Sequence, residues 1–173
     1  MNYQSKPSSF SWNNLGDIQE GRGNLGTDMP VQVYRLFQFT MKDILSREYD
    51  RETACNILRA AGHLAGKHFT QNVLDINMDF HSFIALLEQS LKNLKIGILQ
   101  MEHSDLDALH FILSISEDLD CSGLPVTDET VCDYDEGCIA GIMEEYTGKA
   151  FTVKEVDCWA TGGRTCRFEA KVG

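Results

Sequence analysis

In the second half of the sequence, the spacing of apolar residues changes twice between the two-residue period of a strand and the longer period of a helix. Two pairs of short β-favouring segments, each pair divided by a polar or glycine-rich turn, stand on either side of one helical segment. The expected hairpins cover 95–103 with 109–119 and 151–159 with 164–171, and the helix covers 134–147. This order limits the fold strongly, because two hairpins form an antiparallel sheet that the helix must cover.

Three more helices are expected before the first hairpin. Apolar residues recur at helical spacing from Val31, although alternate residues from Val31 to Phe39 also fit a short strand. Asp50 and Asp79 are N-cap residues for the second and third helices. Gly62 and Gly66 share one side of the second helix, where we expect the backbone of another element to approach closely.

The whole chain is predicted to form one α/β (α+β) domain. Its N-terminal helices pack on an antiparallel sheet of about four strands, with a helix between the two β-hairpins. A chain of 173 residues with 43% hydrophobic content can bury the core of one ordinary domain. Residues 1–30, rich in Ser, Asn and Gly, are expected to be an extended N-terminal arm, and residues 31–173 the single domain.

Charge and hydropathy exclude several classes of protein. A net charge of −11 and a pI near 4.8 repel nucleic acid backbones, so direct nucleic acid binding is not expected. The N-terminus lacks the basic and apolar parts of a secretory signal, and no segment approaches the roughly 20 apolar residues of a membrane span. The sequence predicts a cytoplasmic protein without membrane insertion.

Six cysteines in such a protein point to metal binding more than to a disulfide framework, because cytosolic thiols are kept reduced. Cys55 and Cys138 have apolar neighbours and are expected to be inert core residues. The other four form the chemically interesting set: Cys121, Cys132, Cys158 and Cys166.

The last hairpin suggests how a metal site could form. Pairing its strands about Gly162 sets Cys158 opposite Cys166, close enough for both thiolates to bind one ion. Cys132, just ahead of the helix, is the best third ligand. Glu155 is a candidate for the fourth, but only if a bulge near Val156 turns it to the same face as Cys158. A buried thiol pair or a disulfide between Cys158 and Cys166 fits the same spacing.

These residues resemble a known family. Cys132 is followed by Tyr134, Gly137 and Gly141, and then by Glu155-x-x-Cys158-x7-Cys166-x-Phe168, as in the 4-vinyl reductase (hydrocarbon-binding) domain family. The Tyr34-Arg35-Leu36 segment and the helix around Gly62 and Gly66 resemble its N-terminal half, so the similarity spans roughly residues 30 to 170.

The resemblance implies both a fold and a ligand set. The family is similar in fold to the vesicle-tethering Bet3 subunit and to haem nitric-oxide-binding domains, with a pocket between helices and sheet. Cys132, Glu155, Cys158 and Cys166 correspond to the zinc ligands of sensor proteins in this family. Family members bind effectors in aromatic-sensing transcription activators or accompany bacteriochlorophyll synthesis. The printed sequence carries no ATPase or DNA-binding segment, so we expect a stand-alone version that acts through a partner or its own oligomer.

The leading functional hypothesis is a zinc-stabilised domain that binds or senses a small hydrophobic or aromatic molecule, as a homodimer. A zinc ion with three thiolates and a carboxylate has no open position, so its role would be structural. The expected pocket residues, each of which also fits an ordinary core position, are Phe83, Phe111, Tyr134 and Trp159, with His68 or His110 as a polar handle.

Two alternatives remain open. An enzyme or accessory protein in tetrapyrrole vinyl-group reduction would need a redox cofactor. Gly21-x-Gly23-x-x-Gly26 spells a dinucleotide fingerprint, but it follows a polar arm instead of a strand. A protein-interaction scaffold without a ligand is the other alternative, and the presence or absence of an apolar pocket would distinguish it.

Overall fold

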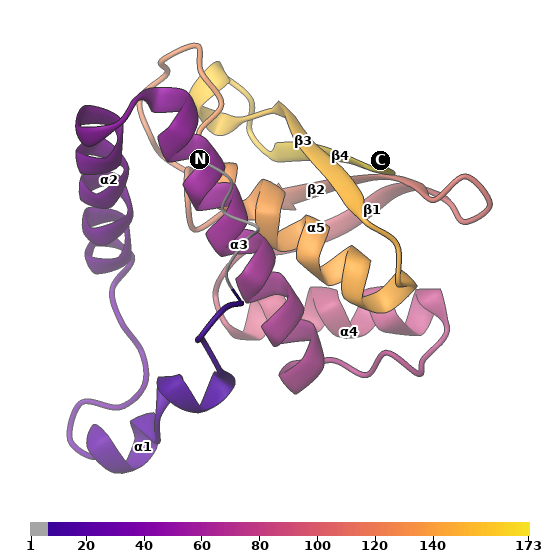
Figure 1. Cartoon of the computed structure of the whole chain (residues 1–173), viewed down its shortest axis with the longest axis horizontal. Helices are drawn as coiled ribbons and strands as arrows, with labels where there is room; N and C mark the ends of the chain where they lie inside the picture. Colours follow the sequence, from indigo (N-terminus) through magenta and orange to yellow (C-terminus); the bar gives the residue numbers. More distant parts are fainter. Residues whose placement is uncertain (1–6) are drawn as a thin grey trace.

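The computed structural model describes residues 7–173 as helices packed on one face of a four-stranded antiparallel sheet (Figure 1). Residues 1–6, the start of the expected arm, lie outside the described residues. The main helices are α2 (Val31–Glu48), α3 (Arg51–Val73), α4 (Phe80–Asn93) and α5 (Asp133–Thr147). The strands are β1 (Ile98–Asp105), β2 (His110–Ser116), β3 (Phe151–Asp157) and β4 (Cys166–Val172). The predicted fold class is confirmed, including the helix between two hairpins.

The sheet order is β1-β2-β4-β3, so the two hairpins meet along β2 and β4. Side chains on one face of these central strands are buried, among them Phe111, Leu113 and Phe168. Exposed charged residues such as Lys154 and Arg167 occupy the other face. This alternation is the pattern of a sheet with one covered face, and α4 and α5 cover it, with α3 packed on α5 as a further layer.

Local signals explain where the helices begin and end. The Asp50 side chain accepts a hydrogen bond from the backbone N–H of Thr53, and Asp79 accepts one from Ser82, so both predicted N-caps are confirmed. Gly148 ends α5 in the left-handed conformation with φ of 69°. The segment from Val31 is helical, not a strand, and the helical spacing turns Tyr34, Arg35 and Gln38 toward the 118–122 loop.

Four glycines let α3 and α5 pack backbone against backbone. A Cβ atom at Gly62 would lie 2.0 Å from the carbonyl oxygen of Tyr134, and one at Gly66 would lie 2.1 Å from that of Cys138. Gly137 and Gly141 of α5 meet the α3 backbone in the same way, at 2.0 and 2.2 Å. The close approach predicted from Gly62 and Gly66 is confirmed, and α5 is its partner.

A bulge in β3 rearranges the last hairpin. Glu155 pairs with Phe168 and Asp157 with Arg167, so Val156 is the extra residue. Glu155 and Cys158 therefore both point inward, with 3% and 0% exposure, while Val156 points outward. Cys158 has left the strand and begins the short 3-10 helix η3 (Trp159–Thr161), which shortens the predicted strand.

Residues 7–30 contain two single-turn elements, η2 (Trp12–Leu15) and α1 (Ile18–Gly21), and reach past α3 before the chain enters α2 (Figure 1). Gly21 ends α1 and the first strand of the sheet begins only at Ile98, so the glycine fingerprint does not follow a strand. No helix in the span 7–173 is both long enough and apolar enough to cross a membrane.

The glycine contact gives a testable prediction. Gly66→Ala should lower the free energy of unfolding by about 3 kcal/mol, the upper end of the range for overpacking, because the new methyl group meets a backbone carbonyl that cannot rotate away. Gly23→Ala, where a Cβ meets nothing within 4 Å, is the matched control and should change stability by less than about 0.5 kcal/mol. Urea denaturation measures both, and equal midpoints would contradict the packing argument.

Candidate functional site

Four cysteines converge behind the first turn of α5. Cys121 lies in the loop after β2, Cys132 is the N-cap of α5, Cys158 precedes η3 and Cys166 begins β4. All four are buried, and their sulfur atoms lie within 4.8 Å of one another. The Cys121 and Cys166 sulfurs are 2.9 Å apart, and the Cys132 sulfur lies 3.7 Å from that of Cys166 and 4.0 Å from that of Cys158.

Thiols this close cannot all ionise without a cation. Hydrogen bonds with the other sulfurs, Cys121 first, together with burial, raise the pKa of Cys132 and of Cys166. The same kind of hydrogen bond lowers the pKa of Cys158, because three neighbouring thiols can donate to one thiolate. Metal ions bind thiolates and displace their protons, so a divalent cation would relieve this competition.

The geometry fits a metal ion. A tetrahedral ion with metal–sulfur bonds of about 2.3 Å holds its sulfurs about 3.8 Å apart, close to two of the distances here. Glu155 lies beside the cluster, where its Oε2 accepts a hydrogen bond from the Cys132 N–H at 3.1 Å. Its Oε1 is buried and has no hydrogen-bond partner within residues 7–173. Burial raises the pKa of this carboxyl to about 8, and a cation bound beside it would favour the ionised form.

The four predicted metal ligands thus lie close together, and Cys121 is a fifth candidate beside them. Cys132, Cys158 and Cys166 meet, and the bulge at Val156 places Glu155 next to them. Cys121 joins the cluster although its spacing carries no signal, because the loop that holds it has no periodic pattern. All six cysteines are free thiols, so the alternative disulfide is not formed.

A cavity of about 480 Å³ adjoins the cluster, between α3, α5 and the N-terminal arm. Most of its wall is apolar, and its polar groups come from Tyr34, His68, Asp120, Tyr134 and Asp135. The arm supplies Phe10, Trp12 and Leu15, and the Phe10 ring packs edge-on against the His68 ring at 5.0 Å between centroids. The arm is therefore part of the cavity wall.

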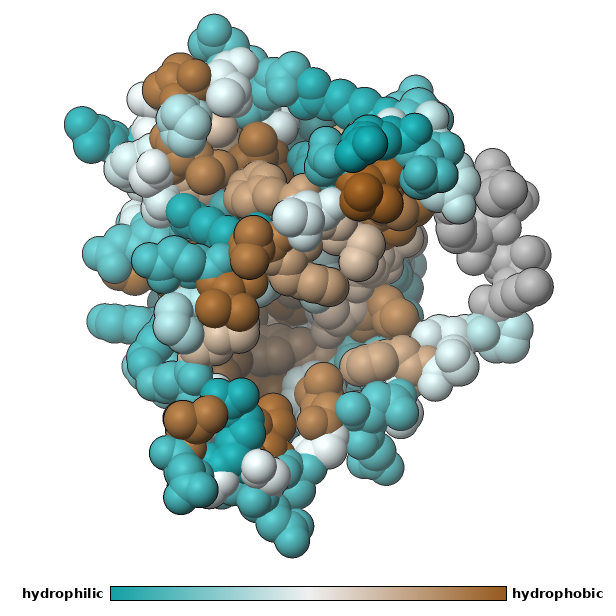
Figure 2. Space-filling model, turned by 90° about the vertical axis from the view of Figure 1, so that its left-hand side faces the viewer, coloured by the Kyte–Doolittle hydropathy of each residue, from teal (hydrophilic) through white to brown (hydrophobic). Residues whose placement is uncertain are grey.

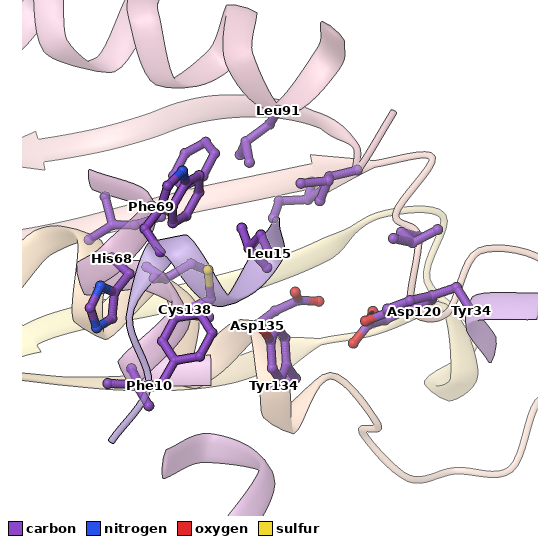
Figure 3. Close-up of a pocket in the computed structure, with 18 residues that line it drawn as sticks. Phe10, Leu15, Tyr34, His68, Phe69, Leu91, Asp120, Tyr134, Asp135 and Cys138 are labelled. Atoms are coloured by element: carbon purple, nitrogen blue, oxygen red, sulfur yellow. Dashed lines mark hydrogen bonds between the residues drawn. The ribbon is translucent and has the colours of Figure 1, made fainter. Parts of the chain in front are cut away.

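The polar end of the cavity is acidic (Figure 3). Asp120 accepts hydrogen bonds from the Tyr34 hydroxyl at 2.8 Å and from Gln38 Nε2 at 2.6 Å. The Asp135 carboxyl points into the same space, and its Oδ2 is buried without a hydrogen-bond partner in the described part of the chain. Burial is the largest cause of the raised pKa of both carboxyls.

Asp135 also links the cavity to the thiol cluster. Its carboxylate, the Asp118 carboxylate and the Cys132 sulfur lie within 4.8 Å of one another. Burial raises the pKa of Asp118 to about 7. The cluster and the polar end of the cavity therefore share one wall.

Two of the six predicted pocket residues line the cavity, namely His68 and Tyr134. Phe83 and Phe111 are fully buried in the core, where Phe83 stacks on Tyr146 and Phe111 on Phe80. The sheet face opposite the helices holds His110, which pairs with Glu169 at 2.9 Å. Trp159 lies outside this cavity and donates its indole N–H to the Leu124 carbonyl at 3.0 Å.

Together these features define a helix-covered antiparallel sheet that holds a thiol cluster beside an apolar cavity. The family model of the 4-vinyl reductase domain matches residues 111–172, from β2 to β4. The resemblance to this family that the cysteine motif indicated is confirmed. An uncharacterised protein of Methanocaldococcus jannaschii is 28% identical over 151 residues, which cover 86% of this chain and 81% of the relative.

Solved structures show the same fold. A vinyl-4-reductase family protein from Methanocaldococcus jannaschii superposes with a TM-score of 0.63 at 21% identity, covering 96% of this chain and 99% of that chain. The phenol-responsive sensory domain of the transcription activator PoxR superposes with a TM-score of 0.69 at 13% identity, and the match covers 85% of this chain and 76% of that chain. A trafficking protein particle complex subunit 3 from Naegleria fowleri superposes with a TM-score of 0.65 at 10% identity, and the match covers 83% of this chain and 95% of that chain. The predicted Bet3-like fold is therefore confirmed. An H-NOX protein from S. oneidensis is more distant, with a TM-score of 0.52 at 16% identity, and the match covers 94% of this chain and 85% of that chain.

The cluster predicts how metal binding depends on single residues. Cys158→Ser should remove most of the bound metal and lower the thermal midpoint, because binding is coupled to folding, whereas Cys55→Ser should retain both. Cobalt absorption and metal analysis of the purified variants measure this. Equal metal content in the two variants would contradict the assignment.

The same assay identifies the fourth ligand. Cys121→Ser should weaken binding more than Glu155→Gln, because the four sulfurs already lie within 4.8 Å of one another. The reverse order would assign the fourth position to Glu155.

Proposed function

We propose that this chain is a zinc-stabilised ligand-binding or sensory domain for a small hydrophobic or aromatic molecule. The observation that carries the proposal is the apolar cavity of about 480 Å³ that shares a wall with the thiol cluster. Its size falls in the range of small-molecule sites, and its wall is apolar except at one end.

Zinc is the metal that the donor set favours, because thiolates in a compact tetrahedron select it over harder ions. Cys132, Cys158 and Cys166 would supply three ligands, with Cys121 or Glu155 as the fourth. An ion with four protein ligands has no open position, so its role would be to fix the start of α5, which forms part of the cavity wall. A cytoplasmic location is part of the proposal, because buried thiols gathered to bind a metal are typical of a reducing compartment.

Structural neighbours support a small-molecule role. The PoxR sensory domain was solved with phenol, and the trafficking subunit was solved covalently bound to palmitic acid. Both ligands have apolar bodies, which the wall of the present cavity would also accept. A vinyl-group reductase remains the alternative function, and it would require a bound redox cofactor.

The cavity is built so that a ligand touches segments near the surface. Trp12 and Leu15 come from the arm and Tyr34 from α2, while Tyr134 comes from α5. A bound molecule would hold arm, α2 and α5 together, and the ordering of the arm would carry the signal to a partner or a second copy.

We further propose that the protein is a homodimer that buries the outer face of α2. Large apolar side chains there are between 41% and 68% exposed: Val33, Leu36, Phe37, Met41 and Ile44. Figure 2 shows the side of the molecule that carries α2, with apolar side chains around a hollow. Apolar patches of this kind mark interaction surfaces, and a symmetric pair of copies would bury two of them at once.

Binding in the cavity can be followed by its own tryptophan. The chain has two tryptophans, and only Trp12 lines the cavity, so 2-phenylethanol should change the emission of the native protein and of Trp159→Phe. Trp12→Phe should lose the change. A change that persists in Trp12→Phe would place binding elsewhere and contradict the proposed site.

Measuring the molecular mass of the protein in solution tests the dimer proposal. Phe37→Glu should give a monomer in light scattering or sedimentation at micromolar concentration, because a charge would be buried in an apolar interface. Leu106→Glu, in the turn between β1 and β2 with 50% exposure, is the matched control and should keep the native mass. A monomeric native protein would rule out the dimer.

A further inference from the structure

Hydrogen-bond acceptors dominate the polar end of the cavity. The groups that reach it are the Asp120 and Asp135 carboxyls and the Tyr34 and Tyr134 hydroxyls, while the His68 ring lies beside Phe10, away from the two carboxyls (Figure 3). Neither lysine nor arginine is among the lining residues. A carboxylate ligand would therefore meet two carboxyls and no lysine or arginine in the cavity lining, which disfavours its binding.

The nearest cations make their contacts outside the cavity lining. Arg35 donates to the backbone carbonyls of Leu119 at 2.7 Å and Ser122 at 2.9 Å. Lys42 and Arg59 form ion pairs with Asp133. Among the ion pairs of residues 7–173, none includes Asp118, Asp120 or Asp135. Three carboxyls in this sheltered region thus stand without a salt-bridge partner, which is costly in a folded protein.

One of these carboxyls is open to a ligand. Both oxygens of Asp120 already accept hydrogen bonds, from Tyr34 and Gln38. Asp135 lines the cavity, and its Oδ2 has no donor within the described residues. Figure 3 shows its carboxyl facing the space between Leu15, Tyr134 and Asp120. The Asp135 carboxyl therefore borders the empty volume, and no group among the described residues donates a hydrogen bond to its buried Oδ2.

We propose that the ligand of this cavity carries a protonated amine on an apolar or aromatic body, and that Asp135 is the residue that binds the ammonium group. This inference rests on the proposed ligand-binding function and names the chemical class of the ligand. An ammonium group offers three donors and a positive charge, which match the Asp135 carboxyl at the cavity wall and the neighbouring carboxyl of Asp120. The rings of Trp12, Tyr34 and Tyr134 add surfaces to which cations bind.

Three probes with the same phenylethyl body but different ends test the proposal by titration calorimetry at neutral pH. The amine is 2-phenylethylamine, the neutral compound 2-phenylethanol and the acid 3-phenylpropanoate. The amine should bind at least about tenfold more tightly than the alcohol, the gain expected from one charge-assisted hydrogen bond, and the acid more weakly than both.

Asp135→Asn should reduce amine affinity about tenfold or more and leave alcohol affinity within about threefold, which also shows that the variant is folded. Its metal content should equal that of the native protein, so that an effect on the neighbouring thiol cluster is separated from an effect on the ligand. Asp107→Asn, an exposed residue in the turn between β1 and β2, makes the same change in net charge and should leave the amine preference intact.

The outcomes separate this inference from the proposed function. If the alcohol or the acid binds as tightly as the amine, or if Asp135→Asn keeps the amine preference, the amine proposal is wrong while the ligand-binding function stands. If none of the three probes binds, both proposals fail.

Discussion

The direct contact between the backbones of α3 and α5 is the constraint on which the other features depend. Four glycines remove the side chains that would hold the two helices apart, and the backbone of each facing residue fills the space instead. This packing fixes the start of α5, and that turn carries Cys132 toward the thiol cluster and Asp135 toward the cavity. A wider separation of the helices would displace both sites together, because they are built on the same helical turn.

The thiol cluster shows how a short irregularity positions chemistry. A regular β3 would turn Glu155 and Cys158 to opposite faces, and the extra residue Val156 brings both inside. The loop after β2, the start of α5, the residue before η3 and the start of β4 then supply one sulfur each to the buried cluster. Among the described residues the site holds competing thiol protons and a carboxylate oxygen of Glu155 without a hydrogen-bond partner, so a bound cation would stabilise it.

Much of this architecture could be predicted from local sequence signals. The caps at Asp50 and Asp79 and the glycine pair of α3 each have a mechanism that acts within a few residues. The bulge at Val156 has no such local signal, and only the ligand set implied by the family resemblance required it. The cavity is harder to predict because its wall joins segments far apart in the chain. Phe111 has the same alternating pattern whether it lines a pocket or fills a core, and only the packing of Phe80 against it decides. Phe10 and Trp12 belong to the arm, whose composition gives no sign that it covers α3.

The loop at 118–122 has a wider consequence. It supplies Cys121 to the cluster and Asp120 to the cavity, and it also holds α2 through Tyr34 and Arg35. Binding at the cluster, binding in the cavity and association at α2 would therefore all act on this one loop, and their binding free energies would be coupled through it. By thermodynamic reciprocity, any factor by which an occupant of the cavity strengthens association at α2 is the factor by which association tightens the hold on that occupant.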